Sequence, residues 1–348
     1  MTAWYATREA TKRAVPITGL AWDAVIDAEL DAATREIETL LRRRFIPLLA
    51  TRQYRWPQRA SGRGYELLLD DDLLSVSALT TDDETVTAIS SSDYFLEPQT
   101  LGPPYHRLEI DQSSSAFLSF KATPQRAVRV TGLWSYSQDT RAAGALAAAI
   151  SDTSGTTITV TDASLVGVGD ALLIDSEQLH VSAKAAATTG TTLSGNPTAS
   201  QSDQSIAVAS GAAVKAGEVI LIDSERMLVI SISSNTLTVQ RAYDGTTLAA
   251  HTASTTVYAF RSLTVERGGN STTAATHSNG ASIRRYVAPA DIQRFCRALA
   301  IQTFTLNQSG WSGVVGSGEQ SIELRGTLLA QERGRIRARY QRRSFGSV

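Results

Sequence analysis

The chain has 348 residues, and because single domains usually run to ~100–200 residues, length alone predicts two domains. Hydrophobic residues make up 42% and charged residues 19% of the chain, which excludes a disordered chain, a collagen-like repeat and a coiled-coil rod. Its 33 basic and 34 acidic residues give no overall charge for nucleic-acid binding, and a single cysteine, Cys296, excludes an intrachain disulfide and a Cys-rich zinc site. Without an apolar run of ~18 residues or a secretory N-terminus, we expect a soluble protein with no membrane partner.

Composition and charge divide the chain into three parts. Residues 138–286 hold 41 Ser or Thr in 149 positions, and all five tryptophans lie outside them. Residues 1–137 carry 15 basic and 18 acidic groups, residues 138–286 carry 9 and 12, and residues 287–348 carry 9 and 4. The net charges are therefore −3, −3 and +5. We predict an N-terminal part (1–137), an inserted domain (138–286) and a basic C-terminal part (287–348).

The N-terminal part begins with a helical pattern and continues with strands. Apolar residues at Ile26, Leu30 and Ile37 recur every three or four positions, which predicts a helix within residues 18–44. Short apolar runs between turn signals then predict a small antiparallel sheet. The expected strands cover residues 64–69, 73–79, 94–96, 107–110, 116–120 and 127–133.

The C-terminal part carries two further helical patterns. Pro289 opens a helix that runs to residue 309 and places Cys296 on its apolar face, as a buried residue and not a nucleophile. A weaker helix is expected over residues 327–340, because Gly334 and a run of arginines oppose it. We therefore expect residues 326–348 to become ordered only against a partner; the alternative is a frayed, solvated terminus.

The strings IDAELDAATREIETLLRRRF, TRQYRWP, YFLEPQTLGPPYHRLEI and VRVTGLWSYS follow one another in the N-terminal part. In order and spacing they resemble the head-to-tail adaptor (connector, or head completion) proteins of tailed bacteriophages. The helix at residues 289–309 and the arginine-rich end resemble the C-terminal helices of that family. The likeness covers about 200 residues outside the inserted domain, and the large insertion departs from the family pattern.

The resemblance implies a structural virion protein at the neck, the head–tail interface, made in the bacterial host cytoplasm. It implies a ring of copies, commonly a dodecamer, that binds the portal protein and tail or neck proteins. Genomic DNA would pass through the ring's channel without sequence specificity. Because an insertion toward a narrow channel would block it, we expect the inserted domain to point outward, where it could contact the capsid, neighbouring protomers or another neck protein. The C-terminal helix of this family docks on the portal. The portal-binding residues expected on this basis are Leu328, Leu329, Arg333, Arg335, Ile336, Arg337, Arg339, Tyr340, Arg342 and Arg343.

The inserted domain contains two kinds of internal repeat. Residues 158–181 align with 206–229 at an offset of 48, and residues 238–251 align with 264–277 at an offset of 26. The second copy of the first kind is followed directly by its own continuation, whereas the first copy is not. We infer that unit two was inserted within unit one, so that residues 264–277 complete the first unit. If strand 263–266 paired only with unit two, this nesting would fail.

Paired acids stand at equivalent positions of the two copies, Asp175 with Glu177 and Asp223 with Glu225. Two carboxylates can cleave a glycoside, but acids two residues apart in a duplicated turn favour a structural role. We expect Glu225 to pair with Arg241, and His251 to bond a turn. The residues assigned to the structure of the repeats are Glu177, Glu225, Arg241, Asp244, His251, Arg267 and His277.

Together these patterns predict an α+β protein, in which a helical adaptor core with a small antiparallel sheet is interrupted by an all-β barrel or sandwich domain. The sequence lacks the signatures of metalloproteases, serine hydrolases, P-loop proteins and dinucleotide-binding proteins. We therefore expect no enzyme, no catalytic or metal-ligating residues and no cofactor. The alternatives are a β module that binds carbohydrate or a host receptor, for which four aromatic residues are available (Tyr243, Tyr258, Phe260 and Tyr286), and a polysaccharide hydrolase.

Overall fold

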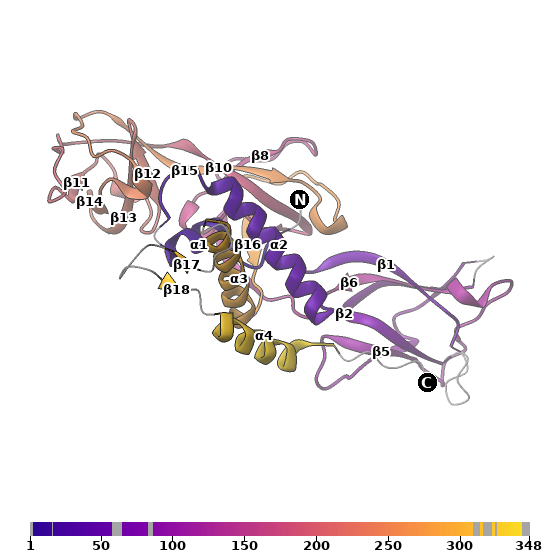
Figure 1. Ribbon diagram of the computed structural model, residues 1–348. Coiled ribbons are helices and arrows are strands. Elements are labelled where there is room, and N and C mark those ends of the chain that lie inside the picture. The colour runs from indigo at the N-terminus through magenta and orange to yellow at the C-terminus, as the bar shows by residue number, and fades with distance from the viewer. Residues whose placement is uncertain are drawn as a thin grey trace.

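The computed structural model describes residues 3–15, 17–57, 65–82, 86–308, 314–315, 322–323 and 326–342; of residues 314–315, 322–323 and 326–328 it describes the backbone alone. The molecule is elongated (Figure 1). The sheet domain, which contains the six-stranded sheet of residues 48–134, lies at one end. The inserted domain of residues 138–286, called the β module below, lies at the other end, and the helices lie between them.

The predicted fold class is wrong. Most of the regular structure is β: two large antiparallel sheets, of six and ten strands, accompany four helices in the described residues. The error arose because short apolar runs were counted as short strands of a small sheet. Several belong to longer strands, whose length is set by pairing with distant segments.

The helices form a compact group whose apolar faces meet in one core. Helix α2 packs along α3, and buried residues such as Ile26 and Leu30 of α2 share this core with Phe295 of α3. Helix α1 was not predicted. The predicted range extended to residue 44, but α2 ends at Leu41, because Arg42 adopts the left-handed conformation that ends the helix. The helices are α1 Arg8–Ala14, α2 Asp23–Leu41, α3 Ala290–Gln308 and α4 Gly326–Tyr340.

The six-stranded sheet has the order β1-β6-β2-β5-β4, with β3 paired to β2. Strand β2 changes partner along its length: Glu66 to Leu68 pair with β5, and Leu73 to Thr80 pair with β6. Residues 116–120, predicted as a strand, form none, whereas β1 and β3 were missed. The strands are β1 Leu48–Tyr54, β2 Glu66–Thr81, β3 Thr87–Ile89, β4 Tyr94–Glu97, β5 Tyr105–Ile110 and β6 Val128–Trp134.

The ten-stranded sheet lies entirely between residues 140 and 286. Its order is β11-β14-β13-β12-β15-β10-β9-β16-β7, with β8 paired to β15. The strands are β7 Thr140–Ala145, β8 Thr157–Thr159, β9 Ala171–Ile174, β10 Glu177–Thr192, β11 Ser205–Ala207, β12 Val219–Ile222, β13 Glu225–Ser233, β14 Thr236–Gln240, β15 Thr256–Glu266 and β16 Ser282–Tyr286. Short 3₁₀ turns include η4 Tyr243–Gly245 and η5 Gly269–Ser271, and a two-stranded ladder pairs β17 Val314–Val315 with β18 Ile322–Glu323.

The sheet folds around two separate cores. Unit one (residues 140–187 and 260–286) encloses Leu172, Leu179 and Ile283, and unit two (residues 188–259) encloses its own cluster. Strands β10 and β15 run side by side from one unit into the other. The nesting predicted from the repeats is confirmed, because residues 263–266 pair with residues 180–184 of unit one and with β8.

None of the helices in the described residues combines the length and the apolar character that a membrane span requires.

Candidate functional site

A buried polar cluster closes unit two. Both oxygens of Glu225 face the Arg241 guanidinium, with Nε 2.8 Å from Oε1 and Nη2 2.9 Å from Oε2. His251 Nε2 lies 2.9 Å from Glu225 Oε2, and its Nδ1 lies 2.7 Å from Oδ2 of Asp223, in the turn between β12 and β13. The Glu225–Arg241 pair predicted from the sequence is therefore present, and His251 bonds a turn residue as expected.

Unit one contains the same cluster. Glu177 receives the Arg267 guanidinium at 2.7 and 2.8 Å, and His277 joins Glu177 at 2.8 Å to Asp175 at 2.7 Å. Each residue stands at the repeat offset from its counterpart in unit two. Each cluster joins a β-hairpin to the segment that follows β14 in unit two and β15 in unit one, so the duplication has preserved the same contact in both units.

The electrostatics of the two glutamates follow from burial and hydrogen bonding. Burial alone raises the pKa of Glu225, but hydrogen bonds from Arg241, from backbone N–H groups and from His251 outweigh it and lower this pKa to about 2. The same balance, with Arg267 and His277, lowers the pKa of Glu177 to about 2. Both side chains are fully buried. A carboxylate that stays ionised and closed to solvent is unsuited to act as the general acid of glycoside cleavage.

The described part of the chain holds no group of three or more His, Cys, Asp or Glu side chains arranged to bind a metal ion.

Each unit also contacts the flanking parts through a pair of residues that stand at equivalent positions of the two repeats. In unit one, Asn270 donates to Gln178, and Gln178 donates to the Pro47 carbonyl. In unit two the pair is Asp244 with Arg226, joined at 2.7 Å. Asp244 accepts from the Gly19 N–H at 3.1 Å and lies 3.0 Å from the Lys12 ammonium. At equivalent positions, the two units thus contact the flanking parts through a neutral pair and a charged pair.

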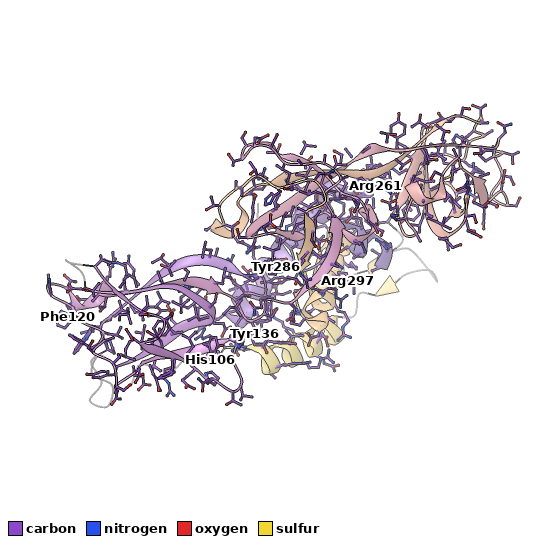
Figure 2. All side chains as sticks on the ribbon, turned by 180° about the vertical axis from the view of Figure 1, so that it is seen from behind. His106, Phe120, Tyr136, Arg261, Tyr286 and Arg297 are labelled. Atoms are coloured by element: carbon purple, nitrogen blue, oxygen red, sulfur yellow. The ribbon has the colours of Figure 1, made fainter. Side chains whose placement is uncertain are left out.

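A further ion pair joins the two units to each other. The Arg261 guanidinium lies 2.7 Å from both oxygens of Glu218, which is fully buried. Glu218 also accepts from the Ala163 N–H of unit one at 2.9 Å. Figure 2 labels Arg261 where the long strands pass between the units.

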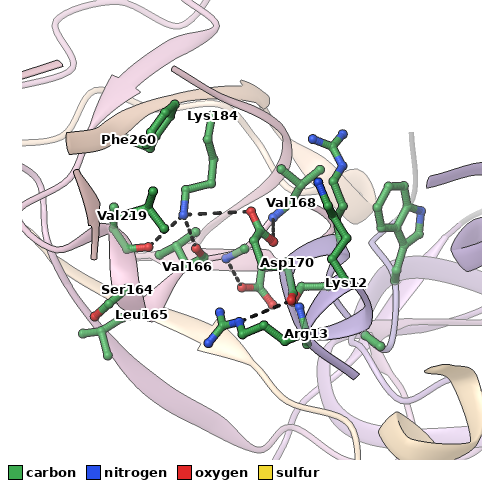
Figure 3. Close-up of a pocket in the computed structure, with 18 of the residues that line it drawn as sticks. Lys12, Arg13, Ser164, Leu165, Val166, Val168, Asp170, Lys184, Val219 and Phe260 are labelled. Carbon is green, nitrogen blue, oxygen red and sulfur yellow. Dashed lines mark hydrogen bonds and ion pairs between the residues drawn. The ribbon is translucent and has the colours of Figure 1, made fainter. Parts of the chain in front are cut away.

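A cavity of about 540 Å³ lies between α1 and both units, and residues of the N-terminal segment such as Trp4 and Glu9 line it (Figure 3). Glu9 accepts from the Val168 N–H at 2.9 Å, and the Lys184 ammonium, 4.0 Å from Glu9, donates to the Ala163 and Val166 carbonyls. Burial lowers the pKa of Lys184 and raises that of the neighbouring Asp170 to about 6. Sequence reasoning missed this cluster, because its members are far apart in the chain.

The C-terminal helix places the expected portal-binding residues in two environments. Ile336, Tyr340 and Arg342 are buried within the chain, at 1%, 4% and 8% exposure, and Leu329 packs partly buried against the same core. The outward arginines contact polar side chains. The ion pairs are Arg333 with Glu36, Arg335 with Glu332 and Arg339 with Asp291, and Arg337 donates a hydrogen bond to Gln341. The Leu328 side chain and Arg343 lie outside the described residues. The outward face of the folded helix is therefore cationic and not apolar.

A buried acid links the sheet domain to the C-terminal end. Asp72 is fully buried at the point where β2 changes partner, 3.1 Å from Arg43 and 3.4 Å from both Arg342 and His106. Burial raises the pKa of Asp72, and the nearby arginines oppose this. The Arg342 guanidinium also donates to the Leu69 carbonyl at 2.8 Å. The sequence signal for this buried acid is the run of three acids inside an apolar strand, LLLDDDLL.

No family model matches this chain, and no curated protein and no solved structure matches it either.

Proposed function

We propose that this protein is a structural assembly protein, a head-to-tail adaptor that forms a ring between the portal and the tail of a tailed bacteriophage and extends the DNA channel. The proposal rests on the resemblance of the flanking parts to that family. Portal, tail and neck proteins and further copies of the chain are the proposed partners, and the β module is proposed to reach the capsid.

Exposed hydrophobic side chains on the sheet domain give the proposal its main structural support. Six of the eleven exposed large hydrophobic side chains of the described residues fall between residues 65 and 120, in the sheet domain; they are Tyr65, Val86, Phe95, Leu101, Phe117 and Phe120. Figure 2 labels Phe120 at the end of this domain that lies away from the helices. Contiguous exposed apolar patches are typical of surfaces that another protein covers, and the concentration of these side chains in one domain supports such a role. A protein that works by assembly needs such a surface.

The polar clusters support assembly over catalysis. Glu177 and Glu225 have every carboxylate oxygen occupied by donors inside their own unit. They stabilise the units and present no reactive group to a substrate.

The carbohydrate-binding alternative has less support. Sugar sites usually present an aromatic face to solvent. Of the four aromatic residues of the module, Tyr258 is the most exposed, at 39%, and Phe260 lies beneath the Arg226 guanidinium at 4.8 Å.

Native mass spectrometry of the full chain, with and without the portal protein of the same phage, tests the proposal. We expect a ring of copies bound to the portal. A chain that remains a monomer and ignores the portal would overturn it.

The outward face of α4 provides the matched variants. Replacing Arg335 and Arg339 by Gln should weaken portal binding, because both side chains are more than half exposed and carry charge toward a partner. Arg141→Gln, on an exposed site of the β module, is the control and should leave binding unchanged.

A further inference from the structure

Strand β1 is an open edge of the six-stranded sheet. All seven of its residues, Leu48–Tyr54, pair with β6 in one unbroken register. Within the described part of the chain, no backbone–backbone hydrogen bond other than those to β6 reaches this strand. The Ala50 carbonyl accepts from the Trp134 indole N–H at 3.0 Å, and the η5 turn lies close to β1. The side of β1 away from β6 has no strand partner in the described residues, and Figure 1 shows the strand along the border of its domain.

No charge on the solvent face, proline or bulge protects this strand, although the η5 turn of the β module lies against part of it. Natural edge strands are kept from pairing by exposed charges, proline, a bulge or short length. On β1, the side chains that alternate on the solvent face are Leu49, Thr51 and Gln53, none of them charged. The one charged residue, Arg52, lies on the other face, where it pairs with Asp71 and covers the Trp134 ring at 4.8 Å. A seven-residue edge of this kind is a template for another strand.

The opposite border of the same sheet is a different edge. Strand β4, Tyr94–Glu97, pairs with β5 alone. Phe95 projects from it and is 44% exposed, one of the exposed hydrophobic side chains on which the proposed function rests. In the described residues, the two borders of the sheet are thus unlike, and β4 carries a partly exposed aromatic side chain.

We propose that β1 of one copy pairs with β4 of the next copy, so that the sheets join edge to edge around the ring. A ring of identical subunits needs a contact between two different surfaces of the chain, because a contact between identical surfaces closes a dimer. The two edges meet this requirement, and strand addition satisfies the free backbone groups of both. Phe95 is then covered against the uncharged face of β1. This inference rests on the proposed ring and names the contact that builds it.

Cysteine cross-linking of the full chain tests the contact. Thr51 is central on the exposed face of β1, and we pair Thr51→Cys with Phe95→Cys in one chain. Under mild oxidation we expect a ladder of disulfide-linked multimers, which each single variant lacks. The native Cys296 does not interfere, since it is fully buried and burial raises its pKa to about 11.

A charged edge gives the second measurement. Gln53→Lys places an ammonium on the open edge and should abolish multimers, or lower their yield at least tenfold, without changing the thermal midpoint of the monomer. The matched control is Ser75→Lys, exposed on the same sheet but on the internal strand β2, and it should assemble normally.

Four outcomes separate the possibilities. Cross-linking by Thr51→Cys alone means that β1 pairs with β1 in a two-fold dimer, and it overturns the inference. Rings on the portal without any β1–β4 cross-link also overturn it and leave the proposed function standing. A chain that never multimerises, alone or with the portal, overturns both. Multimers linked through β1 and β4 that do not bind the portal support the strand contact and contradict the adaptor function.

Discussion

At the scale of single residues, the two β units depend on glutamates that are fully buried and still ionised. Glu225 lies against a buried arginine, whereas Asp223, bonded to the same histidine, has a side chain that is 58% exposed. Removing one partner of a buried pair leaves the other charge in a medium that cannot solvate it, which costs about 3 to 5 kcal/mol. An exposed ionic contact contributes about 0.2 to 1 kcal/mol.

We therefore expect Glu225→Gln to destabilise the protein by about 3 to 5 kcal/mol and Asp223→Asn by about 1 kcal/mol or less. Asparagine tolerates the left-handed backbone that Asp223 adopts, with φ of 52°. Asp223→Asn therefore measures the loss of the negative charge without added backbone strain. Urea unfolding followed by circular dichroism measures both. Equal losses of unfolding free energy in the two variants would contradict the larger contribution of the buried Glu225–Arg241 pair.

The same glutamates predict how stability responds to acid. Their pKa is about 2 in the folded chain, below the ordinary value of 4.5, so the folded state binds fewer protons than the unfolded state between these values. Their contribution is complete above about pH 4.5 and is lost as the pH falls toward about 2. Asp170 acts in the opposite direction, because its raised pKa of about 6 favours folding as the pH falls from about 6 to about 4.

The test compares the native chain with a Glu177→Gln, Glu225→Gln double variant. Asp170 is present in both, so its contribution cancels in the difference between them. The difference in unfolding free energy between the two should shrink as the pH is lowered from 5 to 2.5. A difference that stays constant over this range contradicts the assignment.

At the scale of elements, the N-terminal segment packs closely against Gly169 of unit one. The Trp4 N–H donates to the Gly169 carbonyl at 2.9 Å, and a Cβ at Gly169 would lie 2.2 Å from the Trp4 ring. Gly217, its counterpart 48 residues later, also has a positive φ, but its nearest neighbour would be a Ser164 atom at 3.2 Å. The two glycines therefore differ in packing while sharing the same backbone requirement.

Gly169→Ala should consequently release residues 3–15 from unit one, and Gly217→Ala should not. We expect a cost of about 1 to 3 kcal/mol from the clash, beyond the backbone strain that both variants share. Faster amide hydrogen exchange in residues 3–15 of the first variant alone is the signature. The same exchange rate in both variants would contradict this seating.

At the scale of the whole molecule, the end of α4 ties three parts of the chain together. Tyr340 packs edge-on against Phe45 and Tyr136, and its hydroxyl donates to Asp291. The Arg342 N–H donates to the Leu41 carbonyl at the end of α2, and its side chain reaches the sheet domain. Figure 2 labels Tyr136 and His106 at this junction. The C-terminal end therefore connects α2, α3 and the sheet.

Arg342→Ala should remove the side-chain link to the sheet domain, at a cost of about 1 to 3 kcal/mol for the buried acceptors that it leaves unsatisfied, while the backbone N–H still donates to Leu41. Hydrogen exchange should rise in α4 and around Asp72 together. Arg337→Ala, which changes an exposed arginine of the same helix, is the control and should cost less than about 0.5 kcal/mol. Unchanged exchange around Asp72 in the first variant would mean that Arg43 alone satisfies that acid.

The sequence by itself determined the features that depend on local periodicity or on internal likeness. The apolar stripes predicted α2, α3 and α4 to within a few residues at most ends. The repeat offsets predicted the nesting of the units and the Glu225–Arg241 pair, because both copies retain the same residues at the same spacing.

Only the tertiary structure decided what depends on segments far apart in the chain. The length of β2, the open edge at β1 and the burial of Asp72 all follow from strand pairing, which local patterns do not encode, and the fold class was wrong for this reason. Ile336 and Tyr340 were expected to bind the portal because the C-terminal helix resembles the one that docks there in the adaptor family. The fold buries them against α2 and α3, since the core that receives them is assembled from both ends of the chain.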